Sequence, residues 1–124
     1  NIMQSETQKG LRISTYKCGK KYEKLVVEFF TKKGVKVLET NVFTVYGEAD
    51  IVCAEEDRLI IVEVKGGKRL EEIYERFNRK KLQRLKLVGQ FLCQKYSYKN
   101  FQIDGFIVVA TEGNAKIIQI KNIV

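Results

Sequence analysis

The chain has 124 residues, 44% hydrophobic and 31% charged, and carries 23 basic against 15 acidic residues, a formal net charge of +8. This length and composition predict one globular domain spanning residues 1–124 and exclude a disordered chain. Histidine is absent, which excludes histidine-dependent triads and leaves carboxylates, lysine, tyrosine or a metal for any catalysis. The basic balance favours a polyanionic partner such as nucleic acid, although solvated surface lysines give the same excess.

The three cysteines are Cys18, Cys53 and Cys93, an odd number far apart in the chain. They predict reduced thiols in a cytoplasmic protein rather than a disulfide framework or a zinc site. No secretory signal is visible, and no apolar run approaches the roughly 20 residues that span a bilayer. We therefore expect no membrane partner.

The N-terminal third predicts one helix and one β segment. Residues 1–14 are expected to form a flexible lead or a short edge strand. From Lys17 to Lys33, apolar residues recur at helical spacing, and Gly34 is a typical residue to end such a helix. The expected buried face of this helix comprises Tyr22, Leu25, Val26, Phe29 and Phe30. Glu23 borders that face, where a flanking surface charge is the ordinary interpretation, and residues 35–45 are expected to be extended.

A β-hairpin is predicted next, with strands at Ala49–Ala54 and Leu59–Lys65 around the polar turn Glu55–Arg58. If the chain folds about the 56–57 bond, residues whose numbers sum to 113 lie opposite each other. Asp50 then faces Glu63 across the hairpin.

Side chains alternate along a strand, so Glu63 shares a face with Lys65, and Glu48 shares one with Asp50. Carboxylates gathered in an apolar sheet repel one another and are costly to bury unless they pair with a cation. Lysine supplies one charge, and two or three carboxylates suit a hard divalent ion such as Mg²⁺. The alternative is a solvated polar face beside an apolar one. Glu48 is a secondary candidate for this site.

The C-terminal half predicts a long helical region, Leu70 to about Tyr96, and leaves open whether it breaks near Asn78. Its expected apolar face comprises Leu70, Ile73, Tyr74, Phe77, Leu85, Val88 and Leu92. Its densest basic stretch supplies candidate phosphate contacts, unless it is only a solvated helix face. These candidates are Arg79, Lys80, Lys81 and Arg84. Strands are expected at Phe101–Ala110 and Lys116–Ile120, which gives the order α-β-β-β-α-β-β and an α/β fold with a mixed sheet flanked by helices.

Asp50, followed after a hairpin by Glu63-Val64-Lys65, resembles the D…(D/E)-x-K signature of the PD-(D/E)XK nucleases, which have the restriction-endonuclease-like fold. The strings at 47–52 (GEADIV) and 61–65 (IVEVK) resemble the YraN-like family of small predicted endonucleases. More distantly, they are similar to the archaeal Holliday-junction resolvases.

The resemblance implies a metal-dependent endonuclease that hydrolyses phosphodiester bonds of DNA, with branched DNA such as Holliday junctions as one substrate class. Asp50 and Glu63 would bind Mg²⁺ or Mn²⁺, and Lys65 would act in catalysis. Glu23 matches the G-x-x-x-E that begins the first helix in both related families, where that glutamate lies beside the metal. Lys81 resembles a lysine of the family's later helix.

Two positions depart from the family pattern. Gly66-Gly67-Lys68 stands where an arginine commonly follows the V-E-V-K segment, and Gln102 replaces the arginine of a late F-R-x-D segment. The alternative is therefore a non-catalytic nucleic-acid-binding module of the same fold. A structural protein without a nucleic-acid role is a third hypothesis. The sequence also leaves open whether two copies pair, as they do in junction-cleaving relatives.

Overall fold

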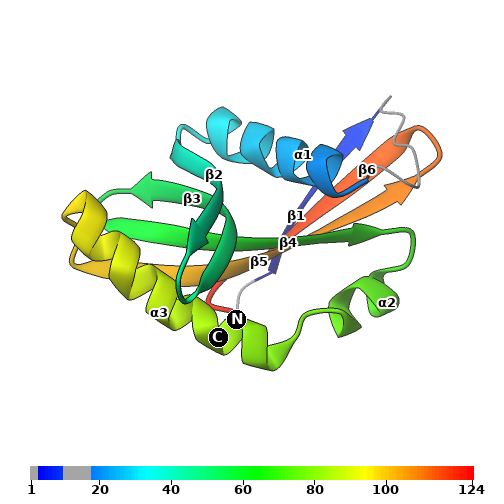
Figure 1. Ribbon diagram of the computed structural model, residues 1–124. Coiled ribbons are helices and arrows are strands. Elements are labelled where there is room, and N and C mark those ends of the chain that lie inside the picture. The colour runs from blue at the N-terminus through cyan, green and yellow to red at the C-terminus, as the bar shows by residue number, and fades with distance from the viewer. Residues whose placement is uncertain (1–2, 10–17) are drawn as a thin grey trace.

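The computed structural model describes residues 3–9 and 18–124 (Figure 1). In chain order the elements are β1 (Met3–Lys9), α1 (Cys18–Lys32), β2 (Lys36–Thr44), β3 (Gly47–Glu55), β4 (Arg58–Gly67), α2 (Leu70–Glu75), α3 (Arg79–Tyr96), β5 (Asn100–Thr111) and β6 (Asn114–Ile120). The described strands form a six-stranded sheet in the order β1-β6-β5-β4-β3-β2. Only the β4–β5 pairing within it is parallel, so the sheet is mixed, as predicted.

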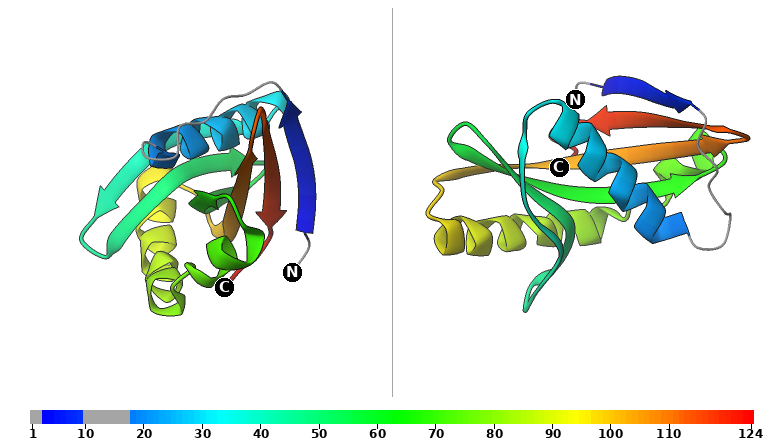
Figure 2. Two further views of the ribbon diagram at one scale, coloured as in Figure 1. Left: turned by 90° about the vertical axis from the view of Figure 1, so that its right-hand side faces the viewer. Right: turned by 90° about the horizontal axis from the view of Figure 1, so that it is seen from above.

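The helices lie on opposite faces of this sheet (Figures 1 and 2). α1 packs on one face in a cluster that includes Phe29, Phe30 and Phe106. α3 packs on the other face, where Leu85 and Val88 meet residues of β3 and β4. The α/β architecture with flanking helices is therefore confirmed. Within the described residues, no helix is long and apolar enough to cross a membrane.

The predicted helix and its apolar face are confirmed in α1. The five residues expected on that face are all buried. The helix ends just before Gly34, which has a φ of +77°, a left-handed conformation that costs glycine little. The chain then turns back at once, because the Val35 N–H donates to the Phe30 carbonyl at 3.0 Å.

The β3–β4 hairpin has the predicted register. Its pairs run from Glu55 opposite Arg58 to Ile51 opposite Val62. The turn is shorter than expected, because Glu55 and Arg58 pair as strand residues and the turn between them comprises 56–57. Glu56 has a φ of +56° there, as tight hairpin turns require.

β1 corrects the predicted element order. Met3–Lys9 is an edge strand that pairs antiparallel with β6, which confirms that alternative for these residues. Residues 1–2 and 10–14, the rest of the expected lead, lie outside the described residues. The observed order is β-α-β-β-β-α-α-β-β, since the helical region is also divided.

The break falls at residues 76–78, and α3 begins after Asn78. The Asn78 side chain accepts a hydrogen bond from the Lys81 backbone N–H at 3.1 Å and so caps the new helix. The break changes the helical phase, and the expected burial of Leu70 and Tyr74 is wrong. Their exposed fractions are 36% and 54%, whereas Ile73 is buried.

This cap gives a first testable prediction. Asn78→Ala leaves the Lys81 N–H without its acceptor, so we expect a loss of about 1 kcal/mol in the free energy of unfolding, measured with chemical denaturant. Asn78→Asp retains the acceptor and adds a negative charge at the helix N-terminus, so its stability should match the unmodified protein. Equal losses in both variants would contradict the capping role.

Gln102, the second departure from the family pattern, has a local partner. Asp104 is fully buried and accepts a hydrogen bond from the Gln102 side-chain amide at 2.9 Å. The Gln119 amide and the Asn122 backbone N–H also donate to Asp104, at 3.0 and 3.1 Å. A buried carboxylate is tolerated when several donors satisfy its oxygens. Gln102 therefore contributes to a network that joins β5, β6 and the C-terminal segment.

Candidate active site

The candidate site lies where β3 separates from β4. The ladder between them ends at Ile51 and Val62, while β3 remains paired with β2 as far as Gly47. Figure 2 shows the far end of the β2–β3 hairpin curving towards α3. Val42 and Ala49, at that end of the hairpin, are buried in the cluster that α3 covers.

Asp50 is the first residue beyond the β3–β4 ladder. Its Oδ2 accepts a hydrogen bond from the Val64 backbone N–H at 2.7 Å. A side chain thus replaces the backbone carbonyl that a continuing strand would have offered to β4. This bond holds the Asp50 carboxylate beside β4, one residue from Glu63.

Glu63 is buried, with 4% of its surface exposed. The Lys65 ammonium, on the same face of β4, lies 3.3 Å from the Glu63 Oε2 atom, and the Lys81 ammonium of α3 lies 3.9 Å from it. Two predicted site residues from β4 and one from α3 therefore converge.

The three carboxylates influence one another electrostatically. Burial, then the charge of Asp50, raises the pKa of Glu63, while Lys65 and Lys81 oppose this rise. Burial, again followed by Asp50, raises the pKa of Glu23 on α1, and hydrogen bonding to Asn41 opposes it. Burial is the main cause of both rises and Asp50 adds to each, so the cluster favours an added proton or cation.

Whether a metal ion fits this site depends on the three carboxylates. Over residues 3–9 and 18–124, no three acidic or cysteine side chains are already arranged as a metal-binding group. Mg²⁺ does not require one, since it usually binds one or two carboxylates and fills its other positions with water and substrate phosphate. Asp50 and Glu63 offer such oxygen donors, with Glu23 beside them, and their mutual repulsion is relieved by a cation. The donor chemistry fits Mg²⁺ or Mn²⁺.

Other predicted residues lie outside this cluster. Glu48 is exposed and pairs with Phe43 nearer the hairpin tip, and it is not among the groups that shift the pKa of Glu23 or Glu63. The structure therefore does not bring Glu48 into the site. The remaining basic candidates are exposed on α3 beside Lys81: Arg79, Lys80 and Arg84.

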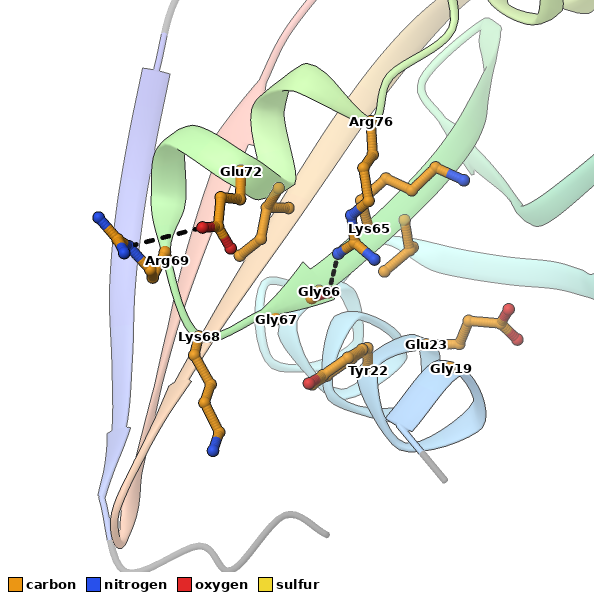
Figure 3. Close-up of a pocket in the computed structure, with 12 residues that line it drawn as sticks. Gly19, Tyr22, Glu23, Lys65, Gly66, Gly67, Lys68, Arg69, Glu72 and Arg76 are labelled. Carbon is orange, nitrogen blue, oxygen red and sulfur yellow. Dashed lines mark hydrogen bonds and ion pairs between the residues drawn. The ribbon is translucent and has the colours of Figure 1, made fainter. Parts of the chain in front are cut away.

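A cleft of about 590 Å³ adjoins the cluster (Figure 3). The start of α1 and the length of α2 form its walls, and the end of β4 forms its floor. Glu23 and Lys65 line both the cleft and the cluster, so the two are continuous. The Arg76 guanidinium, from the end of α2, donates to the Gly66 carbonyl next to Lys65.

Sequence reasoning did not assign three residues of this region to the site. Asn41 has a φ of +53° where β2 bends, and it hydrogen-bonds Glu23. Tyr22 was expected only in the core, yet it also lines the cleft. Arg76 was visible only as one basic residue among many. The available signal was Gly66-Gly67, because paired glycines in a strand often indicate the close approach of another group.

Fold and site together define an α/β protein with a carboxylate–lysine cluster at a fork in its sheet and a basic cleft beside it. The chain belongs to the UPF0102 family: the model of the "Uncharacterised protein family UPF0102" matches residues 22–110. That range contains the whole cluster.

Several curated relatives, each named "UPF0102 protein", are similar over most of their length. The chain is 37% identical to one from Fervidobacterium nodosum over 99 residues, which cover 76% of this chain and 73% of the relative. It is 36% identical to one from Thermotoga petrophila over 94 residues, 76% of this chain and 87% of the relative. One from Kosmotoga olearia is 35% identical over 107 residues, 86% of this chain and 92% of the relative.

Proposed function

We propose that this protein is a metal-dependent endonuclease of the PD-(D/E)XK type, as its resemblance to the YraN-like proteins implies, and that it acts on DNA in the cytoplasm. The observation that carries the proposal is the convergence of Asp50, Glu63 and Lys65 where β3 leaves β4. Glu23 reaches the same place from a different element. The mixed sheet, with a helix before the hairpin and helices between β4 and β5, supports this fold assignment.

Each residue has a role that its chemistry suits. Asp50 and Glu63 would hold Mg²⁺ or Mn²⁺, with Glu23 assisting; when bound, the metal lowers the pKa of water and neutralises charge on the phosphate. The Lys65 ammonium, paired with Glu63, would orient the attacking water or stabilise charge developing on the phosphate oxygens. Lys81 supplies a second ammonium, which opposes the rise in the pKa of the buried Glu63.

The charge distribution supports a nucleic-acid substrate. The first turn of α3 contains Arg79, Lys80 and Lys81 and no acidic residue. Cations are unfavourable at a helix N-terminus, where the helix dipole is already positive, unless an anion binds there. Phosphates of a DNA backbone would satisfy this end of α3, beside the carboxylate cluster. Branched DNA, Holliday junctions included, is the substrate class that we would test first.

One observation favours the second candidate, a nucleic-acid-binding module without catalysis. The Glu63 carboxylate already has two ammonium groups within 4 Å, from Lys65 and Lys81. These pairs compensate its charge without a metal. A module of this kind would keep the basic surface for DNA and use the cluster only for stability.

The proposal is tested on the full-length protein by two measurements. Calorimetric titration with Mg²⁺ and Mn²⁺ should show binding to the unmodified protein. Labelled branched, flapped and linear DNA should then be cut only when a metal is present. Lys65→Ala should lower the cleavage rate by about 100-fold or more while leaving DNA binding nearly intact. Lys99→Ala, at the opposite end of the sheet, is the matched control and should cut normally.

The outcomes separate the hypotheses. DNA binding without cleavage by the unmodified protein, under any metal, would overturn the endonuclease and leave the binding module. Weak DNA binding at every salt concentration would exclude both nucleic-acid roles. A steep loss of affinity with added salt is the expected mark of phosphate contacts.

A further inference from the structure

The cleft beside the cluster has its own pattern of charge. Four basic side chains line it, namely Lys65, Lys68, Arg69 and Arg76, against the two carboxylates Glu23 and Glu72. Glu72 pairs with Arg69 at 3.8 Å. The N-terminal turn of α1 adds the positive end of a 15-residue helix at Gly19. The cleft therefore favours an anion.

The positions of the basic groups suit a chain of phosphates better than one compact anion. Lys65 lies at the end shared with the carboxylate cluster, whereas Lys68 follows the end of β4 (Figure 3). Arg76 stands over β4 from the α2 wall, and its bond to the Gly66 carbonyl uses one of the five N–H donors of a guanidinium. The remaining donors can bind a phosphate, and the Gly66 bond limits how far the side chain can move.

The walls limit what can enter. Tyr22 on α1 and Ile73 on α2 are buried, so packing fixes the part of each wall that lies next to the end of β4. Cavities of about 300–1,000 Å³ hold single small molecules, and this one has about 590 Å³. That volume accommodates one or two nucleotides, whereas a duplex, whose major groove alone is about 12 Å wide, does not fit inside.

We propose that this cleft binds one unpaired strand of the DNA next to the phosphate that is cut, with Lys68 and Arg76 as phosphate contacts. The inference rests on the proposed endonuclease function. It assigns the substrate class to DNA with a single-stranded segment beside the cleavage point, such as a flap, an overhang or an opened branch. Arg76 thereby brings a positive charge to Gly66, close to where the YraN-like pattern commonly has an arginine after V-E-V-K.

The test measures binding without turnover. Fluorescence anisotropy in EDTA compares a labelled single strand, a duplex with an overhang and a blunt duplex. The variants are Lys68→Gln, Arg76→Gln and both together, with Lys99→Gln as the matched control. The double variant should bind the single strand and the overhang about tenfold more weakly. For the single strand, the slope of log affinity against log salt concentration should become shallower by about 1.4, or 0.7 per lost phosphate contact. Blunt-duplex binding should stay within twofold.

Arg76→Gln removes a bond to β4 and so could disturb the end of that strand. Lys68 is exposed, so Lys68→Gln tests the same cleft without that risk. Equal weakening on the blunt duplex, no weakening on the overhang, or no single-strand binding by the unmodified protein would each overturn the strand assignment. Binding is measured in EDTA and so does not depend on catalysis. Failure of the unmodified protein to cut DNA when metal is added would therefore overturn only the endonuclease proposal. Cleavage that persists in the double variant on overhang DNA, with unchanged affinity, would overturn only the cleft assignment.

Discussion

Asp50→Asn is expected to lower the rate of metal-dependent DNA cleavage by about a thousandfold or more, while making the metal-free protein more stable. Loss of this carboxylate would remove a proposed metal ligand and with it several kcal/mol of transition-state stabilisation. Asparagine retains an oxygen that can accept the Val64 N–H, so the bond that holds β3 to β4 survives. The negative charge that raises the pKa of Glu23 and of Glu63 is removed.

The stability gain should depend on pH in a defined direction. The folded-state pKa of Glu63 and that of Glu23 are raised above the ordinary 4.5. Between 4.5 and those raised values the folded protein binds more protons than the unfolded chain, so stability falls as pH rises through that window. Asp50→Asn lowers both pKa values and should flatten this decline, so that the variant gains stability at pH 7.

Thermal and denaturant unfolding from pH 4 to pH 8 in EDTA measures this gain, and cleavage assays measure the loss of rate. Asp57→Asn makes the same chemical change in the exposed turn of the hairpin and should alter neither quantity. Added Mg²⁺ should raise the melting temperature of the unmodified protein and not that of Asp50→Asn. A variant that loses stability at pH 7, or a pH profile with the opposite slope, would refute the electrostatic account of the cluster.

Gly66→Ala is the second change with a large expected effect, about 2–3 kcal/mol of lost stability. A Cβ at residue 66 would lie 2.1 Å from the Tyr22 Cδ2 atom and 2.5 Å from its Cγ. The Cγ atom is close to the helix backbone, and Tyr22 is buried with 6% exposure. The ring therefore cannot swing aside, and α1 or the end of β4 must shift. Such a shift moves Lys65, so cleavage should also fall.

Equilibrium denaturation measures the loss, with Gly19→Ala as the matched control. A Cβ at Gly19 meets nothing within 4 Å, and alanine favours helix, so that variant should be unchanged or more stable by up to about 1 kcal/mol. In a Tyr22→Ala background, Gly66→Ala should cost far less, giving a coupling energy of about 2 kcal/mol. Additive losses would contradict the steric explanation.

The hairpin could be predicted from sequence because two apolar runs rich in Ile and Val flank a short polar turn, which fixes the register. β1 could be predicted only as one of two alternatives, since Met3–Lys9 is mostly polar and has no apolar pattern. The division of the helical region likewise stayed an open alternative. Apolar residues continue through it at helical spacing, and only the capping side chain of Asn78 indicates the break.

The candidate site was predictable where strand alternation determines position, as for Glu63 and Lys65. The placement of Glu23 beside Asp50 depends on how α1 crosses the sheet, which no local pattern encodes. The same reasoning did not hold for Glu48, because the β2–β3 hairpin bends near Asn41. This bend carries the part of β3 that precedes Asp50 away from β4. Arg76 reaches β4 only because the helix breaks directly after it.

The hydrogen bond between Asp50 and the Val64 amide gives the protein an internal probe. The chemical shift of an amide proton depends on the charge of its acceptor. The Val64 resonance in an ¹⁵N-labelled sample should therefore respond when a cation binds the Asp50 carboxylate. In a metal titration at constant pH, the same signal should report occupancy of the carboxylate cluster in real time, with no DNA present.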